Sequence, residues 1–235
     1  MQILTYGADS TQFVQWFEPI CSKDQVKGTI VLVHGGFWRK SYDLHLMDPL
    51  VDYFLQNDWA VANVEYRRAD CGGDWPTILH DVEAAMACAK DQALQQGYAH
   101  RVISVGHSVG GQLVLLTAQL MDAVVALAPV TDVIRAYNDH LGESAAQAFF
   151  QRSPAKAPEC FLSASPIAQL PLQTRTLVVH GSVDERVPVE YARDYCRQAV
   201  FMGDEISYWE ERLTHREVID PNQPFWDRVQ IWLLQ

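Results

Sequence analysis

Five short apolar runs, rich in β-branched residues, alternate along the chain with patterns typical of helices. The runs are GTIVLV at 28–33, AVANVEY at 60–66, VISV at 102–105, AVVALA at 123–128 and TLVV at 176–179. Continuous apolar runs of this length suit strands that are buried on both faces of a parallel sheet. The alternation therefore predicts an α/β fold with a mostly parallel central sheet. A weaker run at 206–209 and an early run at 13–17, expected to be antiparallel, extend the set.

The segments between the runs carry apolar residues at helical spacing. Leu79, Val82, Met86, Ala89 and Ala93 recur every three or four positions, and Gly97 follows as a stop signal. Asp48 is expected to cap another helix, with Pro49 at its first position. Further helices are predicted at 108–120, 189–201 and 223–234. Helices between parallel strands cover both faces of the sheet.

The chain has 235 residues, of which 49% are hydrophobic and 20% charged, enough for one large packed core. We predict a single domain over 1–235. The segment 131–173 is irregular, with four prolines and a short helical stretch around 144–150. We interpret this segment as a small insertion, or lid, over the sheet.

The formal net charge of −11 argues against partners that carry negative charge. Proteins that bind nucleic acid need clustered lysines and arginines, and no basic run here is longer than a pair such as Arg67-Arg68. Neither a signal peptide nor a membrane-spanning run is evident, so a cytoplasmic protein with no membrane partner is expected. The five cysteines form no CxxC pair, which favours reduced thiols. The oligomeric state stays open, a homodimer included.

The strongest chemical signal is Gly106-His107-Ser108-Val109-Gly110, which matches G-x-S-x-G between a predicted strand and a predicted helix. A serine hydroxyl is a weak nucleophile that must be presented to a base, and a tight strand-to-helix turn presents it. Such a turn needs small neighbours. It also places the Val109 N–H at a helix N-terminus, where it can bind an oxyanion.

A second glycine-containing turn, His34-Gly35-Gly36-Phe37-Trp38, directly follows the first buried strand. Acyl transfer needs a second N–H aimed at the developing oxyanion, and glycines let the backbone approach the substrate closely. The rings of Phe37 and Trp38 are candidates for the wall of a substrate pocket.

The fifth apolar run leads into His180-Gly181-Ser182-Val183-Asp184, and His215 follows later in the chain. An acid just past a strand end can hold a histidine in the tautomer that acts as a base. The order Ser108, Asp184, His215 is the one expected for a nucleophile on such a turn. We expect His215, and not His180, to be the base, because His180 follows its strand too closely. Glu65 and Arg67 are expected to form an ion pair nearby.

Together these motifs resemble the α/β-hydrolase superfamily over nearly the whole chain. HGGFW at 34–38 followed by EYRR at 65–68 is similar to the esterase branch that includes the kynurenine formamidases (arylformamidases). The resemblance implies the α/β-hydrolase fold, with Ser108 as nucleophile, Asp184 as acid and His215 as base. It also implies Gly36, Phe37 and Val109 as oxyanion donors. Many relatives have Gly directly before the base, whereas Thr214 stands there in this chain.

These observations predict a serine hydrolase that cleaves short-acyl esters or aryl formamides through an acyl-enzyme, without metal or other cofactor. Its partner would be a small-molecule ester or amide. A peptidase with the same three residues is an alternative that an accompanying propeller or large cap would favour, and the chain is short for either. A catalytically silent binding protein on the same scaffold is a third hypothesis, although such proteins usually lack one of the three residues.

Overall fold

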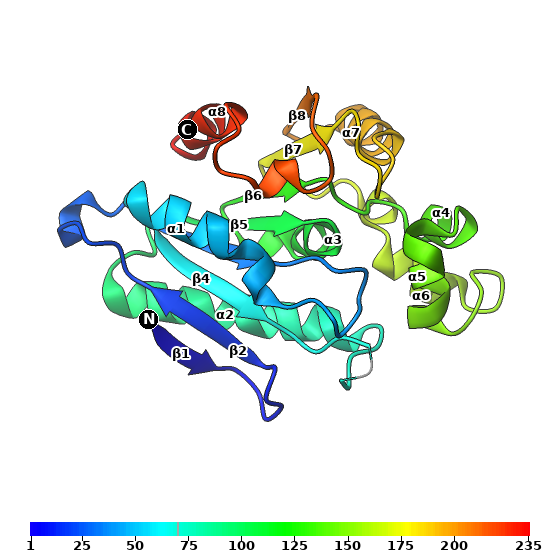
Figure 1. Ribbon diagram of the computed structural model, residues 1–235, viewed down its shortest axis with the longest axis horizontal. Helices are drawn as coiled ribbons and strands as arrows, with labels where there is room; N and C mark the ends of the chain where they lie inside the picture. Colours follow the sequence, from blue (N-terminus) through cyan, green and yellow to red (C-terminus); the bar gives the residue numbers. More distant parts are fainter. Residues whose placement is uncertain (70) are drawn as a thin grey trace.

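A computed structural model describes residues 1–69 and 71–235 and shows a single eight-stranded sheet with the order β1-β2-β4-β3-β5-β6-β7-β8 (Figure 1). The strands are β1 Gln2–Thr5, β2 Phe13–Phe17, β3 Thr29–Val33, β4 Ala60–Glu65, β5 Val102–His107, β6 Ala123–Leu127, β7 Thr176–Gly181 and β8 Ile206–Glu211. From β4 to β8 all neighbours are parallel, while β1 and β2 pair antiparallel at one edge. The predicted α/β-hydrolase fold is confirmed.

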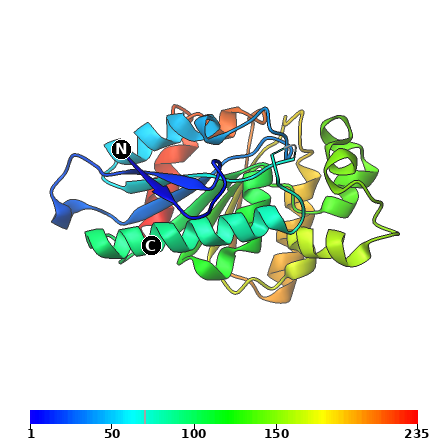
Figure 2. The ribbon, with the colours of Figure 1, turned by 90° about the horizontal axis from the view of Figure 1, so that it is seen from below.

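Helices cover both faces of the sheet and one of its ends. They are α1 Asp48–Gln56, α2 Thr77–Gln96, α3 Val109–Leu116, α4 Val133–Asn138, α5 Leu141–Phe150, α6 Pro158–Ala164, α7 Glu190–Met202 and α8 Phe225–Leu233. Helices α1 and α8 pack on one face, and α2, α3 and α7 pack on the other. Helices α4, α5 and α6 gather at one end of the molecule (Figure 2).

The two faces follow from the alternation of side chains along each strand. In β3, Ile30 and Leu32 belong to the core under α1 and α8, whereas Val31 and Val33 belong to the core under α2 and α3. All five residues of β3 are buried, as the continuous apolar run predicted. The sheet therefore has no water-exposed face at its centre, and its chemistry must lie at a strand end.

The parallel register brings the carboxyl ends of the central strands to a common edge. Val33 pairs with Gly106, and Gly106 pairs with Ala126. Leu127 in turn pairs with Val179, near the end of β7. The turns that follow these strands carry the motifs singled out from the sequence, so residues more than a hundred positions apart meet there.

Some local predictions need correction. Asp48 does not cap α1, because a 3-10 turn at Leu44–Met47 runs directly into the helix and places Met47 in the cap position. Strand β1 was not predicted, since its exposed sequence QILT shows no alternation. The short helical stretch expected around 144–150 is present as the regular part of α5, while Gly142, Glu143 and Ser144 at the start of that element have left-handed backbone angles.

Candidate active site

Ser108 stands alone between β5 and α3, with the strained angles φ 58° and ψ −116°. The turn is so tight that its glycines cannot be replaced without collision. A Cβ on Gly106 would lie 2.2 Å from the Gly110 carbonyl oxygen, and a Cβ on Gly110 would lie 2.0 Å from the carbonyl oxygen of Val33. Strained non-glycine residues persist only where the surrounding structure fixes them, and they concentrate at functional sites. The expected strand-turn-helix around Ser108 is therefore present.

Asp184 and His215 come from the loops after β7 and β8, and the fold brings them into contact. His215 Nδ1 lies 2.7 Å from Asp184 Oδ2. The other carboxylate oxygen of Asp184 accepts backbone N–H bonds from Arg186 and Val187, each at 2.8 Å. Burial alone would raise the pKa of Asp184, but the hydrogen bonds from His180 and His215 outweigh it and hold that pKa well below its usual range. Asp184 is thus a fixed, ionised acceptor.

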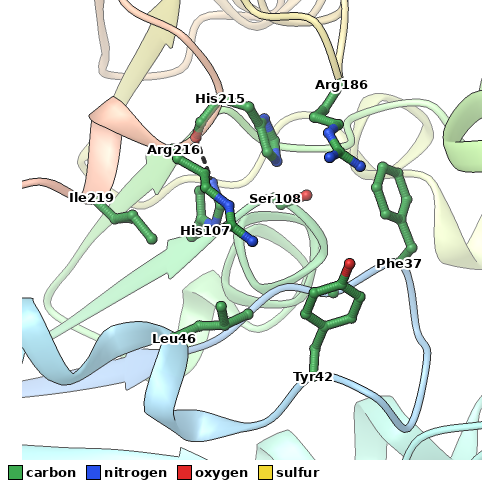
Figure 3. A pocket seen from close by; sticks show the side chains of 10 residues that line it. Phe37, Tyr42, Leu46, His107, Ser108, Arg186, His215, Arg216 and Ile219 are labelled. Carbon is green, nitrogen blue, oxygen red and sulfur yellow. Dashed lines mark hydrogen bonds between the residues drawn. The ribbon is translucent and has the colours of Figure 1, made fainter.

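A contact from the carboxylate to Nδ1 leaves Nε2 of His215 directed away from Asp184. The His215 ring points toward the space in front of the Ser108 hydroxyl (Figure 3). With its Nδ1 proton bound to Asp184, the ring presents a basic Nε2 on the side of the serine. The structure thus gathers Ser108, Asp184 and His215 at one strand edge.

Two further histidines, His107 and His180, hold the loops of His215 and Asp184 in place. His107 Nε2 donates to the backbone carbonyl of His215 at 2.9 Å, and burial lowers the pKa of His107 to about 3. His180 Nε2 lies 2.9 Å from the Val187 carbonyl and 3.3 Å from Asp184 Oδ2. Both side chains are buried. His107 therefore ties the loop of His215 to the turn of Ser108, and His180 steadies the loop of Asp184.

The contact between His180 and Asp184 was not predicted from the sequence, which presents His180 only as an alternative to His215. The sequence does contain a signal for the contact between His180 and Asp184. His180 stands near the end of a predicted strand, four residues before Asp184. His180 is fully buried inside β7, so it faces the acid rather than the open space in front of Ser108.

The turn after β3 approaches the serine as closely as its glycines allow. A Cβ on Gly35 would lie 2.9 Å from Ser108 Cβ. Gly36 and Phe37 have φ of +123° and +52°. Within the described chain, the N–H groups of Phe37 and Val109 donate to no backbone or side-chain acceptor. Two unpartnered donors beside the serine are what an oxyanion site requires.

Trp38 lies outside the pocket in which it was expected. Its ring is 2% exposed, stacks on Phe149 at 5.5 Å and meets Phe150 edge-on. Its Nε1 donates to Gln112 Oε1 at 3.1 Å, and Gln112 Nε2 donates to the Ala164 carbonyl at 2.7 Å. Trp38 therefore anchors the 131–173 segment to the core, while Phe37 alone of the two rings reaches the pocket.

The expected ion pair between Glu65 and Arg67 is wrong. Glu65 pairs with Arg68 in the buried interior, and Arg67 forms a bidentate pair with Asp81. The i,i+2 alternation of a strand would have placed Glu65 and Arg67 on one face. Strand β4, however, ends at Glu65, so the alternation no longer applies beyond it.

A small pocket of about 50 Å³ opens in front of Ser108. Figure 3 shows the side chains around it. Its lining residues are Gly36, Phe37, Tyr42, Leu46, His107, Ser108, Arg186, His215, Arg216 and Ile219. The two arginines, Tyr42, Leu46 and Ile219 were not foreseen. For the arginines the sequence offers one signal, their position: Arg186 stands two residues after Asp184, and Arg216 stands directly after His215.

Comparison with known protein families supports the α/β-hydrolase assignment. The model of the prolyl oligopeptidase family matches residues 77–208, more than half of the chain. The chain belongs to this family. A second model, described as BD-FAE, matches residues 17–122, which include the turn after β3 and the serine turn. The family segment contains Ser108 and Asp184, whereas His215 lies beyond it.

Individual relatives are esterases by name. Esterase LipC of Mycobacterium tuberculosis (strain ATCC 25618 / H37Rv) is 26% identical over 216 residues, which are 81% of this chain and 52% of the relative. The chain thus spans about half the length of this curated relative.

Two solved structures share the fold of this family member. A truncated carbohydrate esterase from gut microbiota has a TM-score of 0.80 at 18% identity and covers 99% of this chain and 94% of its own. The butyrate-bound esterase Est2 of Thermogutta terrifontis has a TM-score of 0.75 at 16% identity, covering 97% and 94%. In the described part of the chain, no helix has the length and apolar character needed to cross a bilayer.

Proposed function

We propose that this chain is a carboxylic-ester hydrolase that works through a Ser108–His215–Asp184 triad and an acyl-enzyme. The observation that carries the proposal is the 2.7 Å contact between His215 and Asp184, on a ring that points toward Ser108 beside two unpartnered N–H donors. The esterase names of the relatives are consistent with it.

The chemistry proceeds in two steps. His215 Nε2 takes the Ser108 proton as Oγ attacks the ester carbonyl, and the resulting imidazolium is stabilised by Asp184. The Phe37 and Val109 N–H groups bind the oxyanion of the tetrahedral intermediate. His215 then protonates the leaving alcohol. A water molecule, deprotonated by the same ring, attacks the acyl-enzyme and releases the acid and the free Ser108.

The proposal is tested by labelling with a fluorophosphonate, which reacts with activated serines. We expect Ser108→Ala to abolish both labelling and hydrolysis of p-nitrophenyl acetate, by on the order of 10⁴-fold or more in kcat. Ser182→Ala is the matched control, because Ser182 is exposed on a neighbouring strand end and outside the pocket. Unlabelled wild-type protein would instead favour a silent binding protein.

We further propose that the acyl group is short. The cavity in front of Ser108 is small, about 50 Å³, and Phe37 is part of its wall. A roomy apolar tunnel would gain ~0.8 kcal/mol for each added methylene, so its rates would rise with chain length. Here we expect kcat/KM for p-nitrophenyl esters from C2 to C12 to peak at C4 or shorter. A peak at C8 or longer would contradict this part of the proposal.

The same assay tests two other classes of substrate. An aryl formamide carries the smallest possible acyl group, so N-formylkynurenine belongs in the panel. The family name favours a peptidase, which a p-nitroanilide of a proline-containing dipeptide would detect. A peptidase must also hold a peptidyl acyl group, which a pocket of about 50 Å³ does not enclose by itself. Turnover of the anilide above that of C2–C4 esters would favour it.

A further inference from the structure

Two arginines stand at the mouth of the pocket and take no part in the proposed acyl transfer. Arg186 lies on the loop of the acid, and Arg216 lies on the loop of the base. Both line the pocket, and both guanidinium groups extend toward the space in front of Ser108 (Figure 3). Each cation is placed by the same loop that carries a triad residue, so its position relative to the serine is fixed by that loop.

The acidic side chains nearby neutralise only part of this charge. Across the residues that the structure describes, Arg216 forms no ion pair within 4.0 Å. Arg186 meets Glu185 at 3.8 Å, with both side chains more than half exposed, which makes a weak pair. Glu217, the next acid along the loop, is engaged by the Thr214 N–H at 2.7 Å and the Thr214 hydroxyl at 2.8 Å. Arg216 thus has no acidic partner at ion-pair distance within the described residues, although the chain as a whole has a formal charge of −11.

We propose that the pocket selects esters that carry a carboxylate a few bonds from the scissile carbonyl, with Arg216 as the main binding residue and Arg186 as the second. For the reaction itself, this inference rests on the proposed function. A guanidinium presents a planar fork of N–H donors that matches a carboxylate. Because Glu185 and Glu217 stand directly beside the two arginines in the sequence, the site suits a singly charged carboxylate better than a dianionic phosphate.

The remainder of the pocket fits such a substrate. Leu46 and Ile219 form an apolar wall beside Arg216, and Phe37 lies beside Arg186. A short acyl or alkoxy chain would cover these apolar groups while its carboxylate reaches the guanidinium groups. In a protein with this negative charge, a local positive site also draws an anionic substrate to the serine.

The experiment compares matched esters that differ in one charge. Monophenyl succinate against phenyl butyrate tests a carboxylate on the acyl side. 4-Acetoxybenzoate against its methyl ester tests a carboxylate on the leaving group. We expect wild-type kcat/KM to favour the anion in at least one pair, by about tenfold. We expect Arg216→Gln to reduce that ratio by about tenfold and Arg186→Gln to reduce it less. Arg212→Gln is the control, because Arg212 is exposed on the same loop but outside the pocket.

Binding to Ser108→Ala protein separates this inference from the proposed function. Calorimetry with monomethyl succinate and dimethyl succinate needs no turnover, and we expect the monoester to bind more tightly unless Arg216 is also replaced. If Ser108-dependent turnover fails but this preference holds, only the proposed function is overturned. If turnover depends on Ser108 but neither ester pair favours the anion, or the preference survives Arg216→Gln, the inference is overturned. Loss of the preference in 0.5 M salt would support it, since screening weakens exposed charge pairs.

Discussion

Asp184→Asn is predicted to inactivate the protein through a change of tautomer. Asp184 Oδ1 accepts the N–H groups of Arg186 and Val187, and Oδ2 accepts from His215. The asparagine must keep its oxygen toward the two backbone donors, because the opposite orientation would leave both without an acceptor. Its NH₂ group then faces His215 Nδ1 and donates to it. The His215 proton consequently sits on Nε2, where the ring can no longer accept the proton of Ser108.

The expected loss in kcat is on the order of 10⁴-fold, the usual cost of holding a catalytic histidine in the wrong tautomer. The assay is hydrolysis of p-nitrophenyl acetate, with circular dichroism to verify folding. Asp204→Asn is a matched control, since Asp204 also accepts two backbone N–H groups, from Leu172 and Gln173 at 2.8 Å each, but faces no histidine. An Asp184→Asn variant with a tenth of the wild-type kcat would refute the tautomer argument.

The same substitution should change how stability depends on pH. The folded pKa of Asp184 lies below its usual value, so the ionised carboxylate stabilises the fold at any pH above the unfolded pKa of about 4. This contribution is lost as the pH falls through the folded pKa. Denaturant titrations should therefore show the largest stability deficit of Asp184→Asn near neutral pH, and a smaller deficit in acid. A deficit that grows on acidification would contradict the assignment of the lowered pKa.

Two further pairs of substitutions, each a test with its control, examine the packing around the site. Gly110→Ala should cost on the order of 3 kcal/mol or more of unfolding free energy, because its Cβ would meet the Val33 carbonyl oxygen at 2.0 Å. Gly203→Ala meets no neighbouring atom and should cost only the strain of its left-handed backbone, about 1–2 kcal/mol. Glu65→Ala should cost about 3–5 kcal/mol in urea titrations, since it leaves the buried Arg68 without its acidic partner. Glu143→Ala, at a side chain that is 90% exposed, should change stability by no more than about 0.5 kcal/mol. Near-equal values within either pair would contradict the reasoning.

The central sheet could be predicted because burial on both faces leaves a strong pattern in the sequence. The β3 run is apolar throughout, so its depth and direction follow from the residues alone. Strand β1 has no such pattern, since its QILT is largely exposed and pairs through its backbone with β2. The corrected pairing of Glu65 shows a related limit: a side chain beyond a strand end takes its direction from the turn, which the strand periodicity does not describe.

The candidate site divides in the same way. Ser108 could be predicted because the steric demands of its turn require glycines at set positions. Arg216 was not predicted, because its place directly after His215 does not tell where its side chain points, and Arg212 on the same loop is exposed in the same way. Trp38 was expected in the pocket because it follows Phe37. With φ of +52° and +58° at these two residues, the chain turns sharply between them and sends the rings to different places.

The hydrogen bonds of Gln112 limit the routes by which a substrate can reach Ser108. This buried side chain joins Trp38, on the turn after β3, to the Ala164 carbonyl at the end of α6. A hinged movement of 131–173 away from the sheet would leave these groups without partners, at about 1–3 kcal/mol for each, and would pull Trp38 from between Phe149 and Phe150. The same movement would strain the turn that holds the Phe37 N–H. We therefore expect these helices to stay in place during catalysis, so that the substrate reaches Ser108 between Arg186 and Arg216.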